Sequence, residues 1–275
     1  MSTQVITDNF PLTQEELDLL NSVVEETHQE IPVNSNALLV SETTSRFSSA
    51  IWFEKIQSKS IILAGLGGIG SWIALLLARM SPACLCLYDD DIVEEANMSG
   101  QLYGLNNISM KKTTALCSIL SNFANYNTSF CFDEKYTEES ATRDIMICGF
   151  DNMEARKTFF NKWLNHVSQL ADEDKANCLY IDGRLAAEEF QILCIKGDDI
   201  YNIKRYKNDY LFTEKEAEET LCSYKQTIFC ANMIASYIVN LFVNFCANQC
   251  NPIVDRYLPF FTSYNAELMF FKTEL

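Results

Sequence analysis

The sequence predicts an α/β fold: a Rossmann-like, mostly parallel sheet flanked by helices, with antiparallel strands at the C-terminal end. An apolar run at residues 61–64 leads through a glycine-rich turn into an apolar segment at 69–80 and a second apolar run at 84–88, the pattern of a βαβ unit. Short apolar runs and longer amphipathic segments keep alternating beyond it. The 275 residues, 48% of them hydrophobic, are also enough to bury a substantial core.

The later elements follow in order from hydrophobic spacing. Apolar residues at helical intervals predict a helix from about residue 108 and another over 153–170. Continuous or alternating apolar runs predict strands at 129–132, 145–148, 178–181 and 190–195, and one or two closing strands at 257–261 and 268–271.

Residues 1–45 precede this pattern and are predicted to be an N-terminal accessory segment, helical or extended, with residues 46–275 forming the main domain. Thr13 and Glu16 have capping-box spacing ahead of apolar residues at positions 17, 20 and 24, which indicates a short helix.

The apolar segment 227–247 is long enough to raise the question of a membrane span. Polar residues recur in it every four positions and therefore form a stripe along one face of a helix: Asn232, Ser236, Asn240 and Asn244. No flanking basic cluster accompanies the segment. We expect a buried core or subunit-interface helix and no membrane partner.

Charge and cysteine usage narrow the function classes. The chain carries 21 Lys and Arg against 37 Asp and Glu, a formal net charge of −16, which repels nucleic-acid backbones and excludes nucleic acid as a principal partner. Many of the 11 cysteines lie in apolar runs and are expected to be reduced core residues. The first ten residues lack a basic stretch followed by an apolar run, so we expect a cytoplasmic protein. Only His28 and His166 are present, and both are expected at the surface.

A glycine loop lies between the first strand and the first helix of the βαβ unit, with glycines at Gly65, Gly67, Gly68 and Gly70. Such glycines let phosphate oxygens approach backbone N–H groups at a helix N-terminus. Asp89 ends the next strand, where a carboxylate can accept hydrogen bonds from ribose hydroxyls. This predicts a nucleotide ligand but does not separate NAD from ATP.

Further polar residues follow the strand ends that should meet at the same edge of the sheet: Asp91, Asn97, Lys112, and the pair Asp151 and Asn152. A cation, an amide and an acid that can hold a metal suit nucleotidyl transfer, in which negative charge builds on phosphate oxygens. Hydride transfer needs none of these groups.

With these motifs the chain resembles the ThiF/MoeB/HesA superfamily, whose adenylate-forming fold is shared with ubiquitin-activating enzymes. The resemblance implies that residues 46–275 are a ThiF-like adenylation domain and that the chain forms a homodimer. It also implies site roles: Asp89 for the ribose, Asn97 and Lys112 for the phosphates, Asp151 for Mg²⁺, and Arg46 reaching across the dimer to the triphosphate.

The implied function is ATP- and Mg²⁺-dependent adenylation of the C-terminal carboxylate of a small ubiquitin-like or sulfur-carrier protein, or of a peptide. Two alternatives remain open at this point: an NAD-dependent oxidoreductase, and a nucleotide-binding partner subunit that has lost catalysis.

The chain departs from the family pattern in three places. Gly100 stands where the family has a phosphate-contacting arginine, a loss that Arg46, Lys111, Arg156 or Arg184 could compensate. Arg156 could instead pair with an acid such as Asp151, and Arg184 could be structural. The family's paired Cys-x-x-Cys zinc motif is absent, although Cys222, Cys230, Cys246 and Cys250 keep a zinc site open. Cys222 is also a weak candidate for a thioester-forming nucleophile.

Overall fold

A computed structural model describes residue 44 and residues 46–212, 226–251 and 255–275, all within the unit Val40–Leu275. The accessory segment predicted over 1–45 therefore lies outside the described residues except for Thr44. The same holds for Cys222 and for His28.

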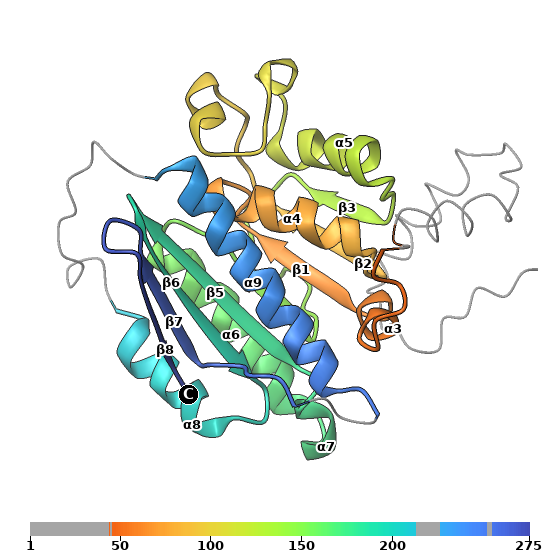
Figure 1. Ribbon diagram of the computed structural model, residues 1–275, viewed down its shortest axis with the longest axis vertical. Helices are drawn as coiled ribbons and strands as arrows, with labels where there is room; N and C mark the ends of the chain where they lie inside the picture. The colour runs from red at the N-terminus through yellow and green to blue at the C-terminus, as the bar shows by residue number, and fades with distance from the viewer. Residues whose placement is uncertain (1–43, 45, 213–225, 252–254) are drawn as a thin grey trace, which may run out of the picture. The chain divides into compact units, whose positions relative to one another are not determined.

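One eight-stranded sheet organises the domain, in the order β3-β2-β1-β4-β5-β6-β7-β8 (Figure 1). Neighbours from β3 to β5 pair in parallel, and β5 to β8 pair antiparallel. The strands are β1 Ser60–Ala64, β2 Cys84–Tyr88, β3 Ser129–Phe132, β4 Ile145–Cys148, β5 Leu179–Ala186, β6 Glu189–Lys196, β7 Phe261–Asn265 and β8 Phe270–Glu274. The predicted fold class is confirmed.

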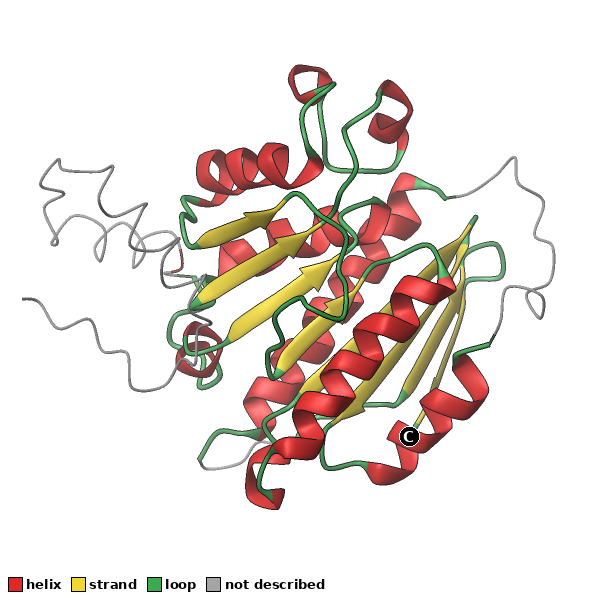
Figure 2. Ribbon diagram, turned by 180° about the vertical axis from the view of Figure 1, so that it is seen from behind, coloured by secondary structure: helices red, strands yellow, loops and turns green. Residues whose placement is uncertain are grey.

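Helices cover both faces of the sheet. They are α3 Phe53–Gln57, α4 Gly68–Met80, α5 Lys112–Ala124, α6 Met153–Gln169, α7 Asp172–Lys175, α8 Ile200–Arg205 and α9 Ile228–Asn248, with 3₁₀ turns η1 Glu95–Ser99 and η2 Leu105–Asn107 and a π-helical turn η3 Tyr206–Tyr210. Helices α4 and α9 lie in front of the sheet in Figure 1, and α6 lies on the opposite face, seen in Figure 2.

Two separate cores result from the two-residue period of the strands. Ile61 and Leu63 of β1 pack with α4, α5 and α9, whereas Ile62 and Ala64 pack with α6 and Tyr206. Continuous apolar strands are therefore required, because both faces of the parallel part are buried.

Helix α9 has 21 residues, and its most apolar stretch of 18 residues has a mean hydropathy of 1.6, so the helix has the length and apolarity of a membrane span. In the structure, 56% of that stretch is buried. It packs against α4, β5 and β6. The polar stripe faces outward, with Ser236 and Asn240 exposed. The prediction of a buried core helix is confirmed for the chain as described.

Several element boundaries differ from the prediction. The helix expected from about residue 108 begins at Lys112, because η2 and the left-handed residue Ser109 (φ 70°) delay it. The closing strands exist but lie two to four residues later than predicted, joined by a tight turn at residues 266–269.

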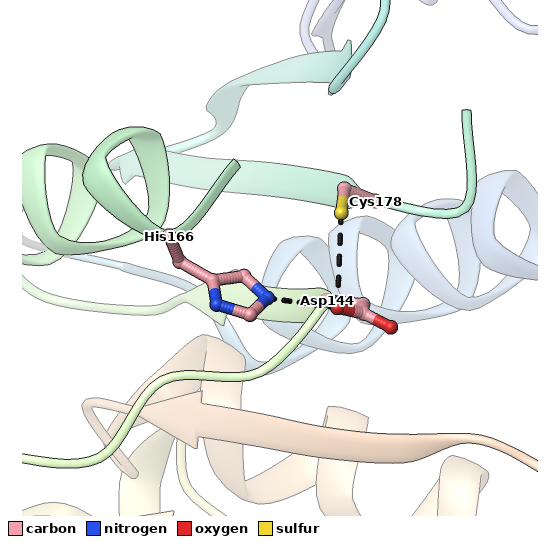
Figure 3. A group of neighbouring side chains, drawn as sticks. All are labelled: Asp144, His166 and Cys178. Carbon is pink, nitrogen blue, oxygen red and sulfur yellow. Dashed lines mark hydrogen bonds and ion pairs between the residues drawn. The ribbon is translucent and has the colours of Figure 1, made fainter. Parts of the chain in front are cut away.

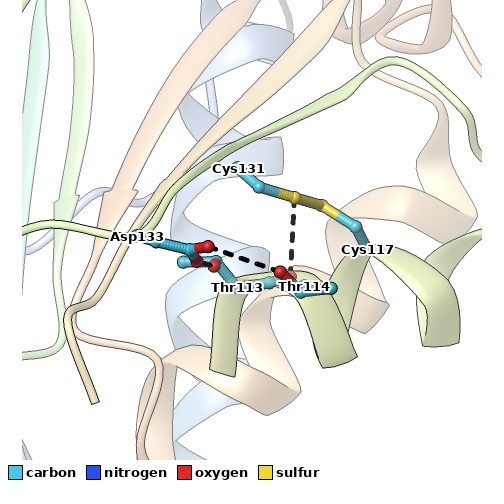
Figure 4. Close-up of a disulfide and its surroundings, with 5 residues drawn as sticks. All are labelled: Thr113, Thr114, Cys117, Cys131 and Asp133. Atoms are coloured by element: carbon cyan, nitrogen blue, oxygen red, sulfur yellow. Dashed lines mark hydrogen bonds between the residues drawn. A yellow bond between two sulfur atoms is a disulfide. The ribbon is translucent and has the colours of Figure 1, made fainter. Parts of the chain in front are cut away.

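One pair of cysteines corrects the expectation that all are reduced. Helix α5 packs against β3, and this brings Cys117 and Cys131 to a Cα–Cα distance of 7.0 Å and joins them in a disulfide (Figure 4). The other eight described cysteines are buried, except for Cys84, which is partly buried. For these the core prediction is confirmed.

Candidate functional site

The glycine loop forms a cradle at the carboxyl end of β1. Gly65 has a φ of +83°, and a Cβ there would lie 2.6 Å from the Gly149 backbone, so only glycine fits. Gly67 is the N-cap of α4 and contributes no capping side chain. The N–H groups of the first turn of α4 lack intrahelical acceptors and carry the positive end of the helix dipole. The loop thus has the features of an anion site.

Asp89 braces this loop from the end of β2. Its Oδ2 accepts from the Leu66 N–H at 2.7 Å, and its Oδ1 accepts from the Asp91 N–H at 2.9 Å. Burial raises the pKa of Asp89, and the Lys112 ammonium and the two backbone donors partly offset the rise. A carboxylate has lone pairs beyond these two bonds, so ribose hydroxyls could still donate to it.

Lys112, the first residue of α5, brings a buried ammonium to the same edge. Its Nζ lies 2.7 Å from Asp91 Oδ2 and 3.8 Å from Asp89 Oδ1, with 8% of the side chain exposed. The Lys112 N–H also donates to the Asp91 carbonyl at 3.0 Å, which fixes the start of α5 against the end of β2. The structure therefore brings together Asp89, Asp91 and Lys112, as predicted from the strand ends.

Asp151 follows β4, the neighbour of β1, and is exposed. Gly149, two residues earlier, packs against Gly65, so Asp151 projects from the loop beside the glycine cradle. Asn152 caps α6 by accepting from the Ala155 N–H at 2.8 Å. An exposed carboxylate oxygen at this position is a ligand of the type that Mg²⁺ prefers.

Asn97 has a local role in the structure. Its Oδ1 accepts from the Glu94 N–H at 2.9 Å and closes a capping box around η1. The Asn97 Oδ1 is occupied by this bond, so only its Nδ2 group could donate to a phosphate. The phosphate-binding role of Asn97 stays a prediction.

Arg46 is not brought to this site within one chain. It is exposed in a turn, and five residues later the Ile51 carbonyl accepts from Cys250 Sγ at 3.3 Å, beyond the carboxyl end of α9. The glycine loop lies at the other end of α9, where Gln226 contacts Gly68. A helix of 21 residues separates the two places by about 30 Å.

Arg156 pairs with Asp182 and not with Asp151, which corrects one of the sequence alternatives. Asp182 on β5 is fully buried and accepts from Arg156, from Arg184 Nε at 2.8 Å and from Tyr206 Oη at 2.9 Å. Parallel pairing of β4 with β5 places Asp182 opposite Cys148, within reach of the first turns of α6. Arg156 and Arg184 therefore both pair with Asp182 in a structural ion cluster.

The same cluster positions the predicted metal ligand. Arg156 Nη2 donates to the carbonyl of Phe150, the residue before Asp151. Nothing local in the sequence signals the pairing of Arg156 with Asp182, because the two residues are 26 positions apart and meet only through the strand register.

Gln226, at the entry to α9, is a site residue that sequence reasoning missed. A Cβ built on Gly100 would lie 2.8 Å from Gln226 Nε2, and one built on Gly68 would meet the same amide. Gln226 thus occupies the space beside Gly100 where the family's arginine side chain would begin. The signal for it was Gly100 itself, which leaves that space open.

The residues present fit a nucleotide with its metal. Beside the uncapped turn of α4, Gln101 Oε1 and Thr227 Oγ1 are buried without a hydrogen-bond partner among the described residues. A Cβ on Gly67 would lie 3.9 Å from Gln101 Nε2, which places this amide over the loop. Unsatisfied buried polar atoms are costly and call for a partner. The phosphates and hydroxyls of a nucleotide supply such partners.

Comparison with known proteins agrees with this geometry. A model of the ThiF family matches residues 40–272. Ubiquitin-like modifier-activating enzyme 5 of Aedes aegypti is 31% identical over 121 residues, covering 38% of this chain and 30% of that protein. The chain therefore spans less than a third of this relative's length.

Solved structures share the fold. PaaA superposes with a TM-score of 0.63 at 14% identity, covering 96% of this chain and 83% of PaaA. E. coli MccB, crystallised with AMPCPP and MccA, superposes with a TM-score of 0.61 at 13% identity, covering 96% of this chain and 79% of MccB.

Proposed function

The chain belongs to the ThiF family, and on that premise we propose that it is an ATP- and Mg²⁺-dependent adenylyltransferase. Its substrate is the C-terminal carboxylate of a small ubiquitin-like or sulfur-carrier protein, or of a peptide. The observation that carries the proposal is the buried ammonium of Lys112 at the same sheet edge as the uncapped glycine loop and Asp89. A cation and backbone N–H donors placed in this way would stabilise the negative charge that develops on phosphate oxygens during the transfer.

ATP supplies the α-phosphorus that a carboxylate oxygen attacks, and the bond to the leaving pyrophosphate breaks; Mg²⁺ neutralises part of the phosphate charge. Asp89 orients the ribose, and the N–H groups at the start of α4 bind the phosphates. Lys112 stabilises the negative charge that grows during the transfer, and Asp151 holds the metal. No base is needed, because the attacking carboxylate is ionised at neutral pH.

Two relatives support the proposed substrate class. The Aedes aegypti protein is named as an activating enzyme for a ubiquitin-like modifier, and MccB was crystallised with MccA and an ATP analogue. Both therefore support a small protein or peptide acceptor.

We propose a cytoplasmic homodimer as the working form. Within one chain Arg46 lies five residues before Ile51, and the place where Ile51 contacts Cys250 is about 30 Å from the glycine loop. The proposed homodimer would let a second copy bring its Arg46 to the triphosphate, as the family resemblance implies.

A second candidate is a nucleotide-binding partner subunit without catalysis. It is favoured by Gly100, which lacks the family's cation, and by the Gln226 side chain against Gly68. Loss of one transition-state contact of this kind costs about 10²–10³ in rate.

Exchange of labelled pyrophosphate into ATP separates the two candidates. The full chain is incubated with Mg²⁺, ATP and candidate carrier peptides, and ATP and NAD binding are measured by calorimetry in parallel. We expect exchange that depends on both a peptide and Mg²⁺. ATP binding without any exchange would establish the silent subunit, and NAD binding with indifference to ATP would refute both.

A further inference from the structure

Three potential metal ligands meet at the amino edge of the parallel sheet, away from the nucleotide site (Figure 3). Asp144 and Cys178 directly precede β4 and β5, whose parallel register pairs Ile145 with Leu179 and so sets the two preceding residues side by side. His166 lies in the last turn of α6, the helix that crosses back between these strands.

The ligand atoms lie close together. His166 Nε2 is 2.8 Å from Asp144 Oδ1, Cys178 Sγ is 3.8 Å from the same oxygen, and all three atoms lie within 4.8 Å of one another. Tetrahedral zinc with bonds of about 2.0–2.3 Å holds its ligand atoms about 3.3–3.6 Å apart. The two separations from Asp144 Oδ1 differ from these values by about half an ångström or less, and the His166–Cys178 separation is at most 4.8 Å, so rotation of the exposed Asp144 and His166 side chains has to bring the three atoms to zinc distances.

The backbone under the cluster is fixed, and one side of it is open to water. The Asp144 carbonyl accepts from the Leu179 N–H at 2.8 Å and from Trp163 Nε1 at 3.1 Å. Cys178 is buried, whereas the side chains of Asp144 and His166 are 53% and 23% exposed. A metal therefore has a path to the site, and a water molecule can complete the coordination.

A nucleophilic triad does not account for the arrangement. In such a triad the imidazole stands between the thiol and the carboxylate, but here Asp144 stands between His166 and Cys178, as Figure 3 shows. Burial raises the pKa of the Cys178 thiol to about 12, so the thiol is not activated for attack.

We infer that Asp144, His166 and Cys178 bind a zinc ion that ties α6 to the starts of β4 and β5. One thiolate, one imidazole and one carboxylate are ligands that zinc accepts in proteins. The cluster does not depend on the proposed adenylation, and it shares no residue with the cysteines for which the sequence left a zinc site open, Cys222, Cys230, Cys246 and Cys250. The nearby charges partly cancel: the Asp174 carboxylate favours a bound cation, and the Lys59 ammonium opposes it.

The test is metal binding by the full chain, measured without any activity assay. After chelation, the protein is titrated with Zn²⁺ and, in a separate sample, with Co²⁺ as a spectroscopic substitute. We expect about one tightly bound ion per chain, a sulfur-to-cobalt charge-transfer band in the near ultraviolet, and a higher melting temperature with Zn²⁺. Affinity should rise with pH, because the Cys178 proton must leave.

Variants assign the ligands. His166→Gln, Asp144→Asn and Cys178→Ser should each weaken binding by more than about tenfold, and Cys178→Ser should also remove the cobalt charge-transfer band. His28→Gln removes the chain's other histidine and is the matched control, expected to bind as the unsubstituted protein does. His166→Gln keeps a polar side chain at a partly exposed position, and circular dichroism verifies that this variant folds. Tight binding retained in His166→Gln, or a cobalt complex without a thiolate band, would overturn the inference.

Discussion

Replacing Lys112 with alanine tests the proposed chemistry directly. The Lys112 ammonium is a charged donor that the structure brings to the glycine-loop edge from a buried position. Losing a fixed donor at developing phosphate charge costs about 10²–10³ in rate. We therefore expect pyrophosphate exchange to fall by that factor, with a smaller change in ATP affinity, because the loop N–H groups remain.

The stability cost of this change can be worked out from the geometry. Lys112 Nζ lies 3.8 Å from Asp89 Oδ1, and both side chains are less than 10% exposed. Two unit charges at this distance attract by about 4 kcal/mol at an effective dielectric constant near 20. The ammonium's own desolvation cost, which alanine removes, offsets much of this. We expect the free energy of unfolding to fall by about 1–2 kcal/mol, which a domain of ordinary stability survives.

Lys111 provides the matched control, since it precedes Lys112 and donates to the Asp90 carbonyl at 2.7 Å. Lys111→Ala should leave exchange nearly unchanged. Urea denaturation of both variants separates lost chemistry from lost folding. Equal losses of exchange in the two variants, or full exchange in Lys112→Ala, would refute the role assigned to Lys112.

Three further predictions follow from the site and its support. Asp182→Asn leaves two buried arginines without their carboxylate, so the free energy of unfolding measured with urea should fall by about 3–5 kcal/mol; a loss below about 1 kcal/mol would contradict the buried ion cluster. Because burial raises the pKa of Asp89, the folded state holds this proton more tightly than the unfolded state, and that stabilisation is lost as pH rises through the raised pKa. The unfolding free energy of the unsubstituted protein minus that of Asp89→Asn should accordingly decrease as the pH rises above the ordinary carboxyl pKa of about 4, and a flat difference would be inconsistent with the raised pKa. Gly100→Arg combined with Gln226→Ala restores a cation and vacates its space, so exchange should rise about tenfold over Gln226→Ala alone, whereas no rise would show that the arginine's absence is not limiting.

Local signals in the sequence were enough to predict that the glycine loop, Asp89 and Lys112 meet at one edge of the sheet. The glycine loop, Asp89 and Lys112 each sit directly at the end of a strand or the start of a helix, and parallel strands bring such ends to the same edge. Knowing which strands are neighbours was sufficient, and the side-chain details were not needed.

Contacts that depend on register or on a distant crossing could not be predicted this way. Asp182 meets Arg156 because β5 pairs with β4 in one particular register, and a shift of one residue would turn Asp182 to the other face of the sheet. Gln226 reaches Gly68 only because α9 crosses over the start of α4. The Asp144, His166 and Cys178 cluster has no sequence motif, although a histidine ending the helix between two parallel strands does lie at their amino edge.

On the proposed function, the ion cluster around Asp182 would support catalysis as well as stability. Asp151 is exposed, and its one hydrogen bond among the described contacts is a long one of 3.5 Å from Asn152 Nδ2, so its own side-chain contacts hold it weakly. The main chain just before Asp151 is fixed by Arg156, which donates to the Phe150 carbonyl and also pairs with buried Asp182. A ligand on a fixed backbone loses less conformational entropy when it binds a metal. On the proposed function, the buried pair would let an exposed carboxylate act from a defined position, a use that could offset the cost of burying charges where apolar packing would cost less.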